Sequence, residues 1–222
     1  MSSFRAREVC SRCGACCSSN PPGLHAQDYE LYAAGVLQKK HLLTLRAGEL
    51  VLDNVQQRVQ SLEQEMVRLQ TKPESKACIF YQPLRQSCTI HGRHPLECRA
   101  QKCWDVSEVY QAYQEPRLGR LDLVPRESAL GQIIQEHEAR CSYLRVRELA
   151  MQILAASGKA QERELAEILE LDQAMRNYLQ QKAGVGNAQL WFIFGRSPQD
   201  TLPGLGLQVR SGQGGFEFRP CL

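Results

Sequence analysis

The stretch Cys10-Ser-Arg-Cys13-Gly-Ala-Cys16-Cys17 places four thiols within eight residues near the start of the chain. A second group follows, formed by Cys78, Cys88, Cys98 and Cys103. In a C-x2-C segment, the two-residue gap lets a tight turn direct both sulfurs to one ion, at metal–sulfur distances of about 2.3 Å. We therefore expect all eight thiols, from two distant parts of the chain, to converge on an inorganic centre that organises the fold.

Thiolate sulfur is a soft donor, which selects zinc or an iron–sulfur cluster over magnesium or calcium. Cys10, Cys13 and Cys16 repeat the C-x2-C gap, as at the start of a ferredoxin run, but the Cys-Pro step that would follow is absent. Cys17 comes directly after Cys16 instead. Because adjacent side chains project in different directions, this pair favours a polynuclear cluster such as [4Fe–4S], with zinc as the alternative cofactor.

The other cysteines and the histidines of this region are given different roles. Cys141 lies on the apolar face of a predicted helix and Cys221 is the penultimate residue, so we interpret them as a buried small side chain and a free thiol. His91 and His94 lie within the second cysteine group and are potential nitrogen ligands. Packing or a backbone hydrogen bond is the commoner role for such histidines.

Composition and net charge indicate which class of protein this chain belongs to. Hydrophobic residues make up 43% and charged residues 23% of the 222 residues, which is ordinary for a soluble globular chain. A net charge of +3, with no basic run longer than a pair, argues against nucleic acid as a partner. No apolar stretch approaches the roughly 20 residues that a membrane span needs. No signal peptide is evident, so we expect a cytoplasmic protein with reduced thiols; a secreted disulfide fold is the less favoured alternative.

The chain is predicted to be an α+β protein in which an irregular, metal-organised N-terminal half with short strands packs against a C-terminal helical hairpin. We assign residues 1–105 to the cysteine-cluster region, with a strand and helix insertion at 38–72. Residues 106–184 form the helical hairpin, and residues 185–222 form a hydrophobic and glycine-rich extension.

Periodicity places the elements within these regions. Helical spacing is present over 25–37, from 130 to a stop at Gly158, and over 165–182 with Gly184 as the cap. Short strands are predicted at 42–45, 50–52, 78–81 and 216–218. The segment 55–70 fits either a helical stripe or, at 66–69, a strand.

Three segments together resemble a known family: Cys10-x2-Cys13-Gly14-x-Cys16-Cys17, then Cys78-x2-Tyr81, then Cys88-Thr89-Ile90-His91-x3-Pro95-x2-Cys98-Arg99. They are similar to the YkgJ-type cysteine-cluster proteins, the CxxCxxCC family, over residues 10–103. The resemblance implies a zinc- or iron-chelating protein, often labelled an iron–sulfur protein. Two positions depart from the family pattern, because His91 stands where tyrosine is usual and His94 where arginine precedes the proline.

Three functions remain open. The preferred one is an iron–sulfur protein that transfers electrons, or acts in modification or maturation of a partner protein of unknown identity. The alternative is a structural zinc protein whose helices bind a partner. The third is a metal-dependent enzyme acting on protein side chains, since the family is related to flagellin lysine N-methylases. This chain lacks a G-x-G-x-x-G loop and a G-x-S-x-G elbow, and Glu97 is interpreted as a surface or loop acid.

Overall fold

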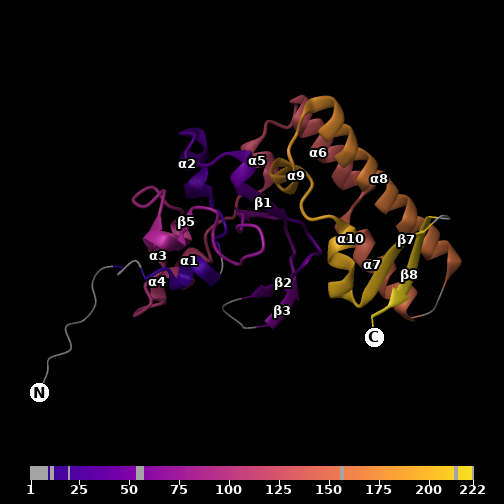
Figure 1. Ribbon diagram of the computed structural model, residues 1–222, viewed down its shortest axis with the longest axis horizontal. Helices are drawn as coiled ribbons and strands as arrows, with labels where there is room; N and C mark the ends of the chain where they lie inside the picture. The colour runs from indigo at the N-terminus through magenta and orange to yellow at the C-terminus, as the bar shows by residue number, and fades with distance from the viewer. Residues whose placement is uncertain are drawn as a thin grey trace, which may run out of the picture. The chain divides into compact units, whose positions relative to one another are not determined.

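The computed structural model describes residues 10, 13–19, 21–53, 58–155, 158–212 and 215–221 (Figure 1). Short helices and two-stranded antiparallel sheets combine with a helical C-terminal region, which confirms the α+β class. The chain divides into two compact units: unit 1 comprises Met1–His41 and Arg68–Leu118, and unit 2 comprises Leu42–Val67 and Gly119–Leu222. Most of the insertion that the sequence placed at 38–72 therefore belongs to the same unit as the C-terminal helices.

Unit 1 carries both cysteine groups on short elements. Its helices are α1 (Ala15–Ser19), α2 (Tyr29–Ala33), α3 (Leu96–Ala100) and α4 (Ser107–Ala112). Strands β5 (Tyr81–Gln82) and β6 (Ser87–Cys88) form a small antiparallel pair. Three 3-10 turns, at Ala26–Asp28, Lys39–His41 and Pro83–Arg85, complete the unit. With so little regular structure, the unit depends on specific polar contacts between its loops.

One such contact involves Asp28, which is fully buried. Its two carboxylate oxygens accept hydrogen bonds from the backbone nitrogens of His25, at 3.0 Å, and Leu96, at 2.8 Å. Asp28 thus satisfies an unpaired N–H at the start of α3. The helix predicted over 25–37 is shorter in the structure, because a 3-10 turn places Asp28 for this contact and α2 ends at Ala33.

Unit 2 contains the longer elements. Its strands are β1 (Leu42–Leu45), β2 (Leu50–Asp53), β3 (Arg58–Ser61), the first half of β4 (Met66–Leu69), β7 (Leu207–Gly212) and β8 (Gly215–Pro220). β1 pairs with β4, β2 with β3, and β7 with β8. The strands predicted at 42–45 and 50–52 are confirmed, and of the two alternatives for 55–70 the structure shows the strand at 66–69. Val55, with which that helical stripe began, lies outside the described residues.

The helices of unit 2 are α5 (Arg120–Leu123), α6 (Ala129–Arg140), α7 (Tyr143–Ala155), α8 (Lys159–Ala183), α9 (Asn187–Ile193) and α10 (Pro198–Thr201), followed by a 3-10 turn at Leu202–Leu205. Helix α8 ends before Gly184 as predicted. The single helix predicted from 130 to Gly158 is wrong, because the chain breaks between α6 and α7 at Cys141-Ser142. There the Arg46 guanidinium donates a hydrogen bond to the Cys141 carbonyl oxygen. This oxygen therefore bonds to a side chain instead of to the backbone of a continuous helix.

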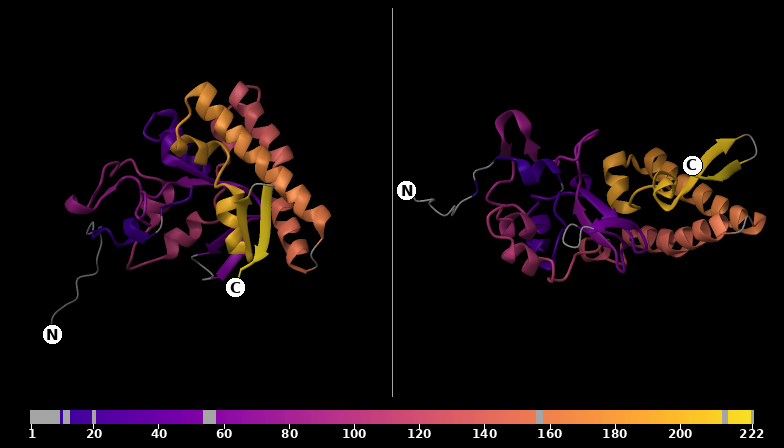
Figure 2. Two further views of the ribbon diagram at one scale, coloured as in Figure 1. Left: turned by 45° about the vertical axis from the view of Figure 1, so that its right-hand side comes forward. Right: turned by 90° about the horizontal axis from the view of Figure 1, so that it is seen from below.

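The apolar core of unit 2 lies between α7, α8 and the β7–β8 hairpin, which Figure 2 shows side by side. Val146, Leu149, Leu165 and Leu169 are fully buried there. Phe216 and Phe218 of β8 pack against this core, so the predicted strand at 216–218 covers the helices. None of the helices in the described part of the chain has the length and apolar composition that a membrane span requires.

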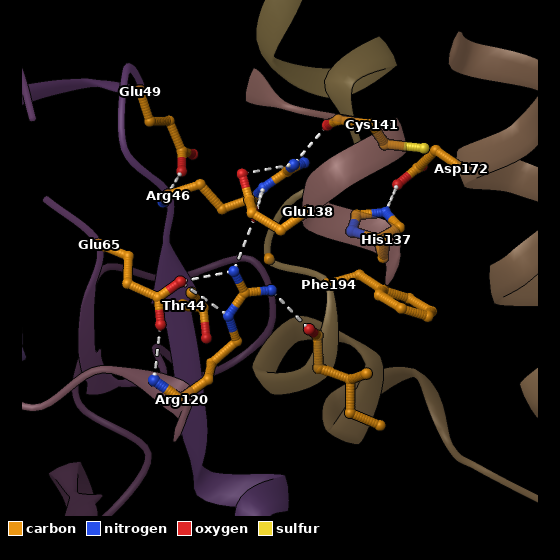
Figure 3. Close-up of polar contacts among 12 residues, drawn as sticks. Thr44, Arg46, Glu49, Glu65, Arg120, His137, Glu138, Cys141, Asp172 and Phe194 are labelled. Carbon is orange, nitrogen blue, oxygen red and sulfur yellow. Dashed lines mark hydrogen bonds and ion pairs between the residues drawn. The ribbon is translucent and has the colours of Figure 1, made fainter. Parts of the chain in front are cut away.

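Unit 2 also contains a buried network of charges (Figure 3). The Glu138 carboxylate accepts from Arg46 Nε at 2.9 Å and from Arg120 Nη2 at 2.8 Å, and both arginines are almost completely buried. Arg120 also donates to Glu65, through its backbone nitrogen at 2.7 Å, and to the Ile193 carbonyl oxygen at 2.8 Å. One carboxylate on α6 thus joins the β1–β2 turn, α5 and α9.

Replacing Glu138 with glutamine should destabilise the protein by about 2–4 kcal/mol, because the buried Arg46 guanidinium loses the carboxylate that it pairs with and Arg120 keeps only Glu65. Glu136 is the matched control: it lies on the same helix and forms an exposed pair with Arg140 at 3.5 Å. Its replacement with glutamine should change stability by less than about 0.5 kcal/mol. Urea unfolding of both variants measures the difference, and equal effects would contradict this account.

A second buried pair joins α6 to α8. The Nε2 atom of His137 lies 2.8 Å from Asp172 Oδ1, and Arg176 Nε donates to the other carboxylate oxygen at 2.7 Å. The His137 ring packs against Phe194 with ring centroids 4.2 Å apart. Burial lowers the pKa of His137 to about 4, although the hydrogen bond to Asp172 acts in the opposite direction. His137 is therefore neutral in the folded protein at neutral pH.

Because the pKa of His137 in the folded state lies below the ordinary value of about 6.5, the unfolded state binds its proton first on acidification. The contribution of His137 to stability should be constant above pH 6.5 and fall by up to about 3 kcal/mol as the pH drops to 4. His137→Gln, which retains a donor for Asp172, should lose most of this slope. Denaturation curves at several pH values test this, and an equally steep slope in the variant would refute the assignment.

Candidate metal centre

The N-terminal cysteine motif approaches Tyr81 through its glycine. Gly14 has a φ of +78°, and a Cβ placed on it would lie 1.9 Å from the Tyr81 hydroxyl oxygen. Only glycine fits this left-handed conformation and this close approach without rearrangement. The glycine therefore brings the start of α1, which carries Cys16 and Cys17, against the start of β5.

Main-chain hydrogen bonds join the two cysteine groups. The backbone nitrogen of Cys78 donates to the carbonyl oxygen of Cys17 at 2.8 Å. The backbone nitrogen of Tyr81 then donates to the Cys78 carbonyl oxygen at 2.9 Å, and Tyr81 pairs with Cys88 across β5 and β6. Cys17, Cys78 and Cys88 thus lie on three segments that are directly connected through the backbone.

Cys98 is positioned by its neighbour Glu97 on α3. The Glu97 carboxylate accepts from the Gly23 backbone nitrogen at 2.8 Å and from Arg117 Nη1 at 3.0 Å, and lies 3.1 Å from His25 Nε2. Burial raises the pKa of Glu97, but these partners outweigh it and hold the pKa below its ordinary value. Glu97 is 8% exposed, so its interpretation as a surface or loop acid is wrong. Its role is to anchor α3 to the segment that follows α1.

Five cysteine thiols lie close enough to change one another's pKa. We refer to Cys16, Cys17, Cys78, Cys88 and Cys98 as the five-thiol group. A hydrogen bond between the adjacent thiols of Cys16 and Cys17 lowers the pKa of Cys16 to about 6 and raises the pKa of Cys17. Burial raises the pKa of Cys98 well above its usual value, and three neighbouring thiolates add to the rise. Cys17, Cys78, Cys88 and Cys98 all have raised pKa values, so loss of their protons is disfavoured unless a cation is bound.

The other five cysteines differ in their exposure to solvent. Cys10, Cys13 and Cys103 are exposed residues of unit 1. Cys141 is completely buried in unit 2, as predicted, with its sulfur 3.8 Å from the Ile168 carbonyl oxygen. Cys221 is partly exposed. None of the ten cysteines, all of which lie in the described part of the chain, forms a disulfide bond.

The donor chemistry of the five-thiol group fits a soft cation. In the described part of the chain, no three Cys, His, Asp or Glu side chains are already spaced as the ligands of one ion. Nevertheless, the five thiols form a set that a soft metal could bind, because a coordinating cation favours the deprotonated state that mutual repulsion otherwise disfavours. Zinc and iron–sulfur clusters are the metals that such thiolates select.

A family model with the description "CxxCxxCC: Putative zinc- or iron-chelating domain" matches residues 9–117. This match includes the whole of both cysteine groups and supports a metal-binding function for unit 1. Neither a curated protein nor a solved structure shows significant similarity to the chain.

Alanine in place of Gly14 should lower the metal content of the protein, because the added Cβ collides with Tyr81 and separates α1 from β5. Gly35→Ala is the matched control: Gly35 has a φ of +71°, and nothing lies within 4 Å of an added Cβ. Both variants carry a backbone strain of about 1–2 kcal/mol, but only Gly14→Ala disturbs the cysteines. Elemental analysis compares the two, and full metal occupancy in Gly14→Ala would contradict the role of this contact.

Proposed function

Through residues 9–117 this chain belongs to the CxxCxxCC family of metal-chelating domains, and we propose that the metal bound by unit 1 is an iron–sulfur cluster. The observation that best supports this proposal is the hydrogen bond from the Cys78 nitrogen to the Cys17 carbonyl oxygen, which holds the two cysteine groups together. The five-thiol group supplies the ligands, and the exposed Cys10, Cys13 and Cys103 are further candidates. A bound cluster supplies one-electron transfer at this site.

The number of sulfurs favours a cluster over one zinc ion. A structural zinc site takes four ligands in a tetrahedron, and the five-thiol group exceeds that number. Moreover, Cys16 and Cys17 are adjacent in sequence and their thiols are hydrogen-bonded to each other. Adjacent residues are awkward partners on one small ion, so the presence of both in one group favours a polynuclear cluster that they could bind at different positions.

We infer that the cluster acts on a partner protein. It would either exchange electrons with that protein or take part in its modification or maturation. Four residues of the five-thiol group are only partly buried or exposed, and Cys78 is the buried one. Electron exchange with a partner needs this kind of access. A reducing compartment such as the cytoplasm suits ten cysteines that form no disulfide bonds.

Structural zinc is the second candidate, and the short elements of unit 1 favour it. The longest helix of unit 1, α4, has six residues, and the strands β5 and β6 have two each. Elements of this length gain little stability from their own hydrogen bonds, so a bound ion would supply folding free energy. Zinc would then close the fold without redox chemistry.

Anaerobic purification distinguishes the two metals. We expect a brown protein that absorbs at about 400 nm and contains iron and acid-labile sulfide. Colourless protein with stoichiometric zinc would replace the cluster with the structural-zinc alternative. Colourless protein without any metal would refute metal binding altogether.

Serine substitutions test the ligands. Cys16→Ser and Cys98→Ser should each lower the metal content and destabilise the fold by more than about 2 kcal/mol, because metal affinity and folding free energy are coupled. Cys221→Ser is the control, since Cys221 is a partly exposed residue of unit 2. Metal content and thermal melting are measured together, and unchanged values for Cys98→Ser would remove that residue from the site.

A further inference from the structure

Two imidazole rings stack on each other in the loop between β6 and α3. The rings of His91 and His94 have centroids 5.1 Å apart and an interplanar angle of 22°. The Nδ1 atom of His94 is buried, and no hydrogen-bond partner for it lies in the described part of the chain. His91 is exposed, so the pair is open to solvent on one side.

The loop that carries the two rings is well fixed. The backbone nitrogen of His91 donates to the Cys88 carbonyl oxygen at 3.2 Å, and that of Arg93 donates to the Ile90 carbonyl oxygen at 2.9 Å. At the other end, Arg99 Nη1 donates to the His94 carbonyl oxygen at 2.9 Å. The turn that carries the two imidazoles is therefore hydrogen-bonded to β6 at one end and to α3 at the other. Binding of a ligand would cost little further conformational entropy of this turn.

Imidazole nitrogen differs from thiolate sulfur in the metals that it selects. It is a borderline donor that suits zinc, nickel and copper ions, and it is a poor ligand for magnesium and calcium. A buried nitrogen without a partner costs about 1–3 kcal/mol, and coordination of an ion removes this cost. Zinc–nitrogen bonds of about 2.0–2.1 Å require the two ligating nitrogens to approach, which rotation of the stacked rings about their side-chain bonds provides.

We propose that His91 and His94 form a second metal site, a two-imidazole chelate for a divalent cation of the zinc, nickel and copper class. Water molecules complete the coordination from the exposed side of His91. With only two protein ligands, the ion is bound more weakly than an ion held by thiolates and exchanges with solvent. This site shares no ligand with the five-thiol group and does not require the proposed iron–sulfur cluster.

Titration of the purified, metal-loaded protein with Zn²⁺ tests the site. Isothermal calorimetry should detect one additional equivalent of zinc, and His91→Gln or His94→Gln should weaken its binding by at least about tenfold. His41→Gln is the control, because His41 lies in the same unit and packs edge-on against Phe80. Absence of an additional equivalent, or unchanged binding in both variants, would overturn the proposal.

X-ray absorption at the zinc edge identifies the ligands without any substitution, so the test does not depend on how the variants fold. The additional zinc should have nitrogen and oxygen neighbours only, and sulfur neighbours would assign it to the thiols instead. In Cys98→Ser the thiolate-bound metal should decrease while the additional equivalent remains. If the protein proves to lack an iron–sulfur cluster, the zinc bound by His91 and His94 should still be detected. The two proposals can therefore be refuted independently of each other.

Discussion

The hydrogen bond between the Cys78 nitrogen and the Cys17 carbonyl oxygen is the constraint on which the metal centre depends. It is a main-chain contact, and the close approach of the Gly14 backbone to the Tyr81 side chain accompanies it. The two cysteine groups are therefore brought together before any sulfur is coordinated. A centre built in this way places its ligands by the backbone and leaves the side chains to adjust to the ion.

In each unit, one carboxylate accepts hydrogen bonds from several donors and so holds irregular segments together. In unit 1, Glu97 joins Gly23, His25 and Arg117. In unit 2, Glu138 joins Arg46 and Arg120. Desolvation offsets much of the Coulombic attraction in such pairs, so their main effect is to permit one arrangement of the segments and to penalise others. This suits a fold in which several loops must be placed with little regular structure.

Local patterns in the sequence were sufficient for several features. The cysteine spacing, the long helix that ends before Gly184 and the strands at 42–45 and 50–52 all depend on neighbouring residues. The burial of Glu97 and the break at Cys141-Ser142 depend on partners far along the chain, Arg117 and Arg46, which periodicity does not reveal. Likewise, the spacing of the eight cysteines does not reveal which thiols influence one another, whereas tertiary contacts bring five of them into one group.

The interleaved course of the chain affects how the protein is made. Leu42–Val67 leaves the ribosome between the two cysteine groups, yet it belongs with residues that are synthesised last. Thr44, for example, donates to the Phe192 carbonyl oxygen at 2.6 Å. A nascent polypeptide that already contains every thiol of unit 1 still has β1 without its partner helix α9. The matched segment 9–117 thus contains β1, which reaches its packed position only after its partner α9 has been synthesised.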